Sequence, residues 1–184
     1  MKLVVGLIGR MGAGKGVVSD YINEKYGASQ HRFSQVLMDL LDRLYLPHDR
    51  KLLQELGACI RNKLGMGIIV DAFKKDLERD GSKIIVVDGI RYKNEVEMLR
   101  SFENNLLLSI DAPVKLRYER CKNRGEKGES TITYKEFLEA ENRETERYID
   151  DIKEMADYVI ENTGTLGELF EKTDNILNIN SVSL

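Results

Sequence analysis

The sequence predicts an α/β protein of three layers, in which a mostly parallel sheet lies between two layers of helices. Short apolar runs typical of strands buried on both faces alternate with longer helical patterns along the whole chain. Glycine, proline and capping residues separate the two kinds of segment. A chain of 184 residues can bury a sizeable core, so we expect residues 1–184 to form a single domain.

Five segments are predicted to be strands. Leu3–Gly9, Lys83–Asp88 and Leu106–Asp111 are continuous apolar runs of the kind found in buried parallel strands. Two weaker candidates lie near Gln30 to Phe33 and at Tyr158–Glu161. Ligands of such sheets bind outside the carboxyl ends of the strands, so we expect the functional residues there.

The helices are predicted from their start and stop signals. Ser34 is expected to cap a helix that Pro47 ends. Thr133 with Glu136, and Thr165 with Glu168, have the spacing of a capping box. The expected helices are Lys15–Tyr26, Ser34 to about Leu46, about Asp49 to Leu64, Ile68–Asp80, Asn94–Ser101, Asp111 to Asn123, and one after each capping box.

Composition excludes several classes of protein. The 28 basic and 31 acidic residues give a net charge of −3, which argues against a dedicated nucleic-acid binder. The two cysteines are far apart and show no metal-ligand spacing. No apolar run approaches the ~18 residues of a membrane span. We therefore expect a cytoplasmic protein with reduced thiols and no nucleic-acid or membrane partner.

A glycine-rich loop follows the first strand. The residues from Gly9 to Lys15 fit the pattern G-x-x-x-x-G-K between a strand and a helix. Glycines let backbone N–H groups turn toward phosphate oxygens, the helix directs its positive end at them, and Lys15 adds a catalytic charge. The candidate nucleotide-binding residues of this segment are Gly9, Met11, Gly12, Ala13, Gly14, Lys15, Gly16 and Val17.

The loop departs from the general motif in one respect. A Ser or Thr usually follows the lysine and binds Mg²⁺, but here Gly16 and Val17 follow. The loop Gly12-x-Gly14-Lys15-Gly16 resembles that of adenylate-kinase-type nucleotide kinases. We expect the ion to be held by ATP phosphates and water.

A second candidate site follows the strand Lys83–Asp88. Asp88 can bind Mg²⁺ through water, and Arg91 can grip a phosphate with two hydrogen bonds. We interpret Asp88 as a metal-site residue and Arg91 as a catalytic and acceptor-binding residue. The alternative is a helix cap at Asp88 and a surface arginine.

Two further groups of arginines are candidates. Arg50, Gln54, Gly57 and Arg61 share one helical face, which is either an acceptor-binding face or simply solvated. Residues 120–147, which include a charged loop from Arg124 to Ile132, form a candidate lid that would exclude water and place positive charge on a transferred phosphoryl group. Many acidic residues there leave an ion-paired surface as the alternative. The lid candidates are Arg120, Arg124 and Arg143, the first two of them catalytic and Arg120 also nucleotide-binding.

The last strand ends in the segment Asn162-Thr163-Gly164-Thr165. With Ala156 to Ile160 before it, this segment resembles A-D-x-V-I-x-N-x-G of dephospho-coenzyme A kinases, in which the loop packs on adenine. The resemblance implies nucleotide contacts at Asn162, Gly164 and Thr165. The alternative is a capped turn into the last helix.

Together these residues resemble the P-loop nucleoside and deoxynucleoside monophosphate kinases, including dephospho-coenzyme A kinase-like proteins, over nearly the whole chain. The resemblance implies a five-stranded parallel sheet, a helical acceptor-binding insert over about 34–80, a short lid over about 120–147, ATP and Mg²⁺. The implied acceptor-binding residues are Ser34, Arg50, Arg61, Arg91 and Arg143.

Two departures bear on the acceptor. Dephospho-coenzyme A kinases carry an acid that serves the attacking hydroxyl, where this chain reads Arg32-Phe33-Ser34-Gln35. Adenylate kinases carry an arginine where Leu40 stands. A phosphate acceptor needs no base, so the sequence favours ATP-dependent transfer to a nucleoside or deoxynucleoside monophosphate, by a monomer or homodimer. A dephospho-coenzyme A kinase-like enzyme and a non-catalytic nucleotide-binding regulatory module remain alternatives.

Overall fold

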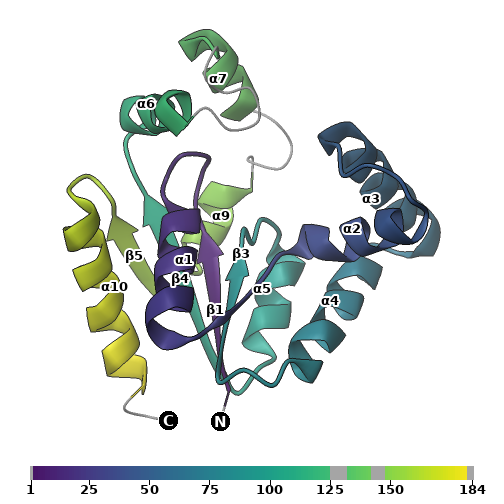
Figure 1. The fold of residues 1–184 in the computed structure, drawn as a ribbon, viewed down its shortest axis with the longest axis horizontal. Coiled ribbons are helices and arrows are strands. Elements are labelled where there is room, and N and C mark those ends of the chain that lie inside the picture. The colour runs from purple at the N-terminus through teal and green to yellow at the C-terminus, as the bar shows by residue number, and fades with distance from the viewer. Residues whose placement is uncertain (1, 125–131, 142–147, 182–184) are drawn as a thin grey trace.

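A five-stranded, all-parallel sheet forms the middle of the molecule, with strand order β2-β3-β1-β4-β5 (Figure 1). The computed structural model describes residues 2–124, 132–141 and 148–181. The strands are β1 (Leu3–Ile8), β2 (Ser29–His31), β3 (Ile84–Asp88), β4 (Asn104–Asp111) and β5 (Tyr158–Glu161). The predicted fold class is thus confirmed.

Helices cover both faces of the sheet. They are α1 (Lys15–Tyr26), α2 (Phe33–Arg43), α3 (Arg50–Leu64), α4 (Ile68–Arg79), α5 (Lys93–Arg100), α6 (Val114–Arg124), α7 (Tyr134–Glu141), α9 (Ile149–Lys153) and α10 (Leu166–Ser181). None of the helices in the described ranges is long and apolar enough to cross a membrane.

Strand β1 explains the layered core, because every one of its residues is buried. Leu3, Val5 and Leu7 pack with α1 and α10 on one face. Val4 and Ile8 pack with α4, α5 and α9 on the other face. Alternating side chains of a strand point to opposite faces, so a continuous apolar run is what a central strand of three layers requires.

Both predicted boundaries of helix α2 were wrong. Helix α2 begins at Phe33, with Arg32 in an extended conformation as its N-cap, so Ser34 lies in the first turn and does not cap it. The helix ends at Arg43 because Tyr45 adopts a left-handed backbone with φ of 59°. The sequence offered Pro47 as the stop signal, which lies beyond this turn.

Two groups of helices extend from the sheet near the carboxyl ends of its strands (Figure 1). We call α2, α3 and α4 the helical insert, because they connect β2 with β3. We call α6 and α7 the arm, because they follow β4. The turn between β1 and α1, which carries the glycine-rich loop, lies between the insert and the arm (Figure 1).

Candidate active site

The glycine-rich loop connects β1 to α1, and hydrogen bonds between its own residues stabilise it. Gly9, Gly12 and Gly14 have φ of 147°, 76° and 110°, values that other residues rarely adopt. Lys15 donates from Nζ to the carbonyl oxygens of Gly9 (2.6 Å) and Arg10 (3.3 Å). The predicted loop residues therefore form one closed turn at the N-terminus of α1, where backbone N–H groups favour an anion.

Asn162 is buried beneath this loop. Its Nδ2 donates to the carbonyl of Ala13 (2.8 Å), and its Oδ1 accepts from Arg120 Nη2 (3.3 Å). A β-carbon at Gly14 would collide with the Asn162 amide nitrogen, so this close approach requires glycine. Asn162 thus connects the loop to the arm, and a nucleotide contact by Asn162 stays a prediction.

The turn after Asn162 also has the predicted cap. The Thr165 hydroxyl accepts from the Glu168 backbone N–H at 3.3 Å, at the start of α10. The predicted nucleotide contacts of Gly164 and Thr165 are therefore compatible with a capped turn, and remain predictions.

One guanidinium nitrogen of Arg120 is buried and has no hydrogen-bond partner among the described residues. This nitrogen is Nη1, while Nη2 reaches Asn162. A buried guanidinium N–H without a partner is costly, and such groups commonly await a ligand or water. Of the other lid candidates, Arg124 ends α6, and Arg143 lies outside the described residues.

Arg117 has a structural task that the sequence did not reveal. It is buried and forms a bidentate ion pair with Glu141 of α7, while its Nη1 donates to the Met11 carbonyl at 3.2 Å. The arm is therefore fixed to the glycine-rich loop. In the sequence, Arg117 shares a helical face with Arg120, and no local pattern distinguishes a buried arginine from an exposed one.

Asp88 ends β3 beside Leu7 of β1. Its Oδ1 is buried and has no hydrogen-bond partner in the described part of the chain, and its Oδ2 lies 3.5 Å from Arg32 Nε. The N–H groups of Gly89 and Ile90 donate to Leu7, so the residues after Asp88 continue along β1 instead of starting a helix. The alternative of a helix cap at Asp88 does not hold, because α5 begins at Lys93.

The residues present fit a water-bridged Mg²⁺ but not a protein-enclosed metal. Within the described ranges, no three His, Cys, Asp or Glu side chains converge on one point. Mg²⁺ in nucleotide sites is often held by one carboxylate, waters and substrate phosphates. Asp88 offers that single carboxylate, because its buried Oδ1 has no hydrogen-bond partner among the described residues. A β-carbon at Gly16 would meet no atom within 4 Å, so packing does not exclude a hydroxyl there.

A buried carboxylate that the sequence analysis missed lies beside the backbone of Arg91. Glu95 is 7% exposed, and its Oε2 accepts from the backbone N–H of Arg91 (2.7 Å) and Tyr92 (3.3 Å). Burial raises the pKa of Glu95 to about 7, against the lowering effect of these N–H groups and of the Arg91 and Arg61 charges. The spacing Tyr92-x-x-Glu95 was the available signal, although tyrosine is an unusual capping residue.

The predicted acceptor-binding face of α3 stays a prediction, although Gly57 on this face is closely packed. At Gly57 a β-carbon would lie 3.1 Å from Leu37 Cδ1 and 3.3 Å from the Arg61 guanidinium, so glycine permits both neighbours to approach. Arg50 begins α3, but its side chain is outside the described part. Ser34 is half-buried in the first turn of α2.

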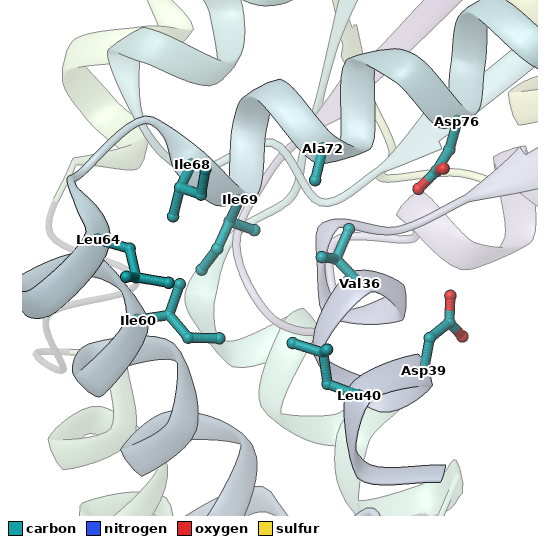
Figure 2. A pocket seen from close by; sticks show the side chains of 9 residues that line it. All are labelled: Val36, Asp39, Leu40, Ile60, Leu64, Ile68, Ile69, Ala72 and Asp76. Atoms are coloured by element: carbon teal, nitrogen blue, oxygen red, sulfur yellow. The ribbon is translucent and has the colours of Figure 1, made fainter. Parts of the chain in front are cut away.

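The insert also contains an apolar groove of about 340 Å³ between α2, α3 and α4 (Figure 2). Two carboxylates, Asp39 and Asp76, lie together at one end of it. The apolar lining residues are Val36, Leu40, Ile60, Leu64, Ile68, Ile69 and Ala72. No residue of the glycine-rich loop lines the groove, so it is a separate feature of the insert.

The fold and the loop together define a P-loop kinase-like, nucleotide-binding protein. Residues 5–149 match the AAA domain family AAA_18, and the chain belongs to this family. It is 27% identical over 183 residues to the UPF0200 protein of Pyrococcus horikoshii, with 96% of each chain covered. It is 29% identical over 175 residues to the UPF0200 protein of Sulfurisphaera tokodaii, with 95% of each covered.

Solved structures with this fold include shikimate kinases. The shikimate kinase of Bacteroides thetaiotaomicron gives a TM-score of 0.62 at 12% identity, covering 96% of this chain and 98% of that one. The shikimate kinase of Aquifex aeolicus gives 0.57 at 16% identity, covering 97% and 98%. At these identities the likeness shows the fold alone. The resemblance to P-loop kinases expected from the sequence is confirmed.

Proposed function

We propose that this protein is an ATP-dependent phosphotransferase whose acceptor is a nucleoside or deoxynucleoside monophosphate. One observation carries the proposal. Asp88 Oδ1 and Arg120 Nη1, both buried and without partners among the described residues, flank a phosphate-binding loop. A carboxylate oxygen that can bind a hydrated cation and a guanidinium that can bind a phosphoryl group are the groups that such a transfer uses.

In the proposed reaction the chain positions and stabilises charge without forming a covalent intermediate. The loop N–H groups and Lys15 bind the β- and γ-phosphates of ATP. An acceptor oxygen forms a bond to the γ-phosphorus while the bond to the bridging oxygen of the leaving ADP breaks. Arg120 and Arg91 stabilise the charge on the phosphoryl group and the acceptor. Mg²⁺, when bound with ATP, would neutralise phosphate charge, and Asp88 would hold it through water.

The cations near Asp88 and Glu95 favour an anionic acceptor. Arg32 stands beside Asp88, and Arg91 follows three residues after Asp88, with its backbone N–H bonded to Glu95. Arginine binds phosphate with planar, paired hydrogen bonds and cannot serve as a base at neutral pH. A phosphate acceptor is already ionised, so the chemistry offered here suits a phosphate better than a hydroxyl group.

The test is an acceptor screen. ADP release from Mg-ATP is measured with each ribo- and deoxyribonucleoside monophosphate, with dephospho-coenzyme A, and with shikimate, the substrate of the structural neighbours. The Lys15→Ala variant is the matched control for contaminating kinases. We expect strong stimulation by one monophosphate that the variant lacks.

Other outcomes lead to different functions. Stimulation by dephospho-coenzyme A or shikimate alone would show a hydroxyl acceptor and contradict the proposal. Tight ATP binding without stimulation by any acceptor would favour a regulatory nucleotide-binding module. Separate measurement of ATP affinity by calorimetry distinguishes this second outcome from an inactive preparation.

A further inference from the structure

Helix α3 of the insert has an apolar face that a single copy of the chain only partly covers. Its apolar residues Leu53, Leu56, Ile60 and Leu64 recur at helical spacing, yet the first three are half-buried and Leu64 is 69% exposed. Most of the stability of a helix in a protein comes from packing of its apolar face. The exposed face therefore indicates that α3 has a further packing partner.

The exposed apolar surface continues beyond α3. Half of the large apolar side chains that are exposed among the described residues lie between positions 40 and 68. Leu40, Leu64 and Ile68 line the groove of the insert, whereas Leu44 and the 90% exposed Tyr45 extend the surface past it. A small molecule in the groove would not cover this whole surface. Large exposed apolar patches on soluble proteins mark protein interaction sites.

The groove carries opposite charges at its two ends. Asp39 and Asp76 lie together at one end, and Leu64 lies at the other (Figure 2). The exposed Lys63 stands next to Leu64 in the last turn of α3. Gln35 donates to Asp39 at 2.6 Å, whereas the side chains of Asp76 and Lys63 have no hydrogen bond or ion pair with any residue that the structure describes. These two charges are therefore available to a partner.

A surface with an acidic end and a basic end is complementary to a second copy of itself. In a two-fold dimer the same face of each copy contacts the other, so each pairwise contact occurs twice. A two-fold axis that crosses the groove at right angles places the acidic end of one copy over the basic end of the other. Apolar surface and charge thus both match a second copy of this chain.

We propose that this face of the insert is the contact between two copies of the chain in a two-fold dimer. The exposed apolar residues of the two α3 helices bury one another, and Lys63 of each copy pairs with the Asp39 and Asp76 carboxylates of the other. The inference goes beyond the proposed function. It places the dimer contact on the helix that also carries Arg61.

The first experiment measures the mass of the full-length protein by sedimentation equilibrium over a range of concentrations. We expect a dimer for the wild type. Leu64→Asp is expected to weaken association at least about tenfold, because it puts a charge into the apolar contact twice per dimer. Ile179→Asp changes a similarly exposed residue of α10 and is expected to leave the dimer intact. Equal association in these two variants would overturn the inference. So would a monomeric wild type, which would leave the groove to a small molecule or a different protein.

The second experiment exchanges the charges between copies. Lys63→Glu makes both ends of the groove acidic, and the double variant Asp39→Lys, Asp76→Lys makes both ends basic. Each is expected to associate about tenfold or more weakly than the wild type, because like charges then face each other. An equimolar mixture is expected to recover a dimer with one chain of each kind. Lys51→Glu, an exposed lysine of α3 that does not line the groove, is the matched control for Lys63→Glu.

Recovery in the mixture shows that both variants fold and that the two copies meet through these charges. If the mixture stays monomeric while circular dichroism shows both chains folded, the inference is overturned. Neither experiment uses an acceptor or ATP, so the result is independent of the acceptor screen.

Discussion

The two regions that we assign to the nucleotide and to the acceptor are built differently. On the nucleotide side, the glycine-rich loop is contacted by Asn162, which directly follows β5, and by Arg117 of α6, and both of these side chains are buried. On the insert side, burial is described for residues 51–64 of α3, and among these only Gly57 is buried. Leu64 at the end of that helix is 69% exposed. One side is tightly packed, and the other presents partly exposed side chains around a groove.

This difference matches the two tasks that a phosphotransferase must perform, which are binding a nucleotide phosphate and recognising an acceptor. Phosphate is common to all nucleotides, so a preformed loop can serve it with backbone groups alone. Acceptors differ in shape, and under the proposed function the insert would recognise them through side chains, of which those of α3 are exposed or half-buried. Under the proposed function, we therefore expect the nucleotide side to define the class of reaction and the insert to decide the particular acceptor.

Lys15→Ala tests the nucleotide side and has the largest expected effect. Loss of its charge at the phosphates is expected to lower kcat/KM roughly 100-fold or more, as for other groups that stabilise a transition state. Steady-state kinetics with the screened acceptor measure this. Lys135→Ala, an exposed lysine of α7, is the control. Equal activity in both variants would remove Lys15 from the site.

Arg91→Ala tests the insert-facing side with the same readout. We expect kcat/KM to fall by roughly 100-fold, with most of the loss specific to the acceptor and little change in ATP affinity. Surface ion pairs are worth only ~0–1 kcal/mol, so a loss below about tenfold would contradict the assignment. Arg100→Ala is a useful control, because that arginine pairs with Asp157 away from the loop.

The Glu95→Gln variant tests the buried carboxylate beside Arg91 through the pH dependence of stability. Folding raises the pKa of this carboxyl from 4.5 to about 7. Between these two pH values the carboxyl is therefore protonated in the folded protein and ionised in the unfolded chain. Relative to Glu95→Gln, the wild type is expected to gain stability as pH falls from about 7 to 4.5, by up to ~3 kcal/mol. Urea unfolding of both proteins at several pH values measures the difference. A constant difference across this range would contradict the raised pKa.

Asn162→Ala tests the packing of the nucleotide side. The change leaves the Ala13 carbonyl and a second nitrogen of Arg120 without their partner. We expect a loss of about 1–3 kcal/mol in the free energy of unfolding, the cost of unsatisfied buried groups. Asn175→Ala in α10 provides a comparison. A loss below a few tenths of a kcal/mol would mean that the loop does not depend on this amide.

Gly16→Ser has the smallest expected effect on the fold. The space around Gly16 is open, so stability is expected to change by no more than ~0.5 kcal/mol. An added hydroxyl supplies the ligand that the loop lacks, and we expect activity to saturate at lower Mg²⁺ concentration. A Mg²⁺ titration of kcat compares both proteins. An unchanged Mg²⁺ dependence would show that the hydroxyl does not reach the ion.

Sequence reasoning predicted the sheet, the loop and most of the helices because each rests on local patterns, whereas the short helix α9 was not predicted. The apolar run of β1 and the G-x-x-x-x-G-K segment can be interpreted without knowing what packs on them. The capping box at Thr133 and Glu136 was confirmed, with hydrogen bonds in both directions. These features depend on neighbours within a few residues.

Features that depend on distant parts of the chain were missed. Glu95 is a polar helix residue in the sequence, and only the arrangement of α5 against its neighbours buries it. Arg117 and Arg120 lie on the same helical face and cannot be told apart in the sequence, yet Arg117 pairs with Glu141, which lies 24 positions further along the chain. The start of α2 at Phe33 was missed for a similar reason, since no local capping side chain marks it.

The Arg117–Glu141 pair also sets the mechanics of the arm. Arg117 fastens α6 to α7 through Glu141 and to the glycine-rich loop through the Met11 carbonyl. Moving either helix alone would strand a buried charge, at a cost of about 3–5 kcal/mol. We therefore expect α6 and α7 to move together, and we expect the Arg117–Met11 hydrogen bond to transmit any such movement to the glycine-rich loop.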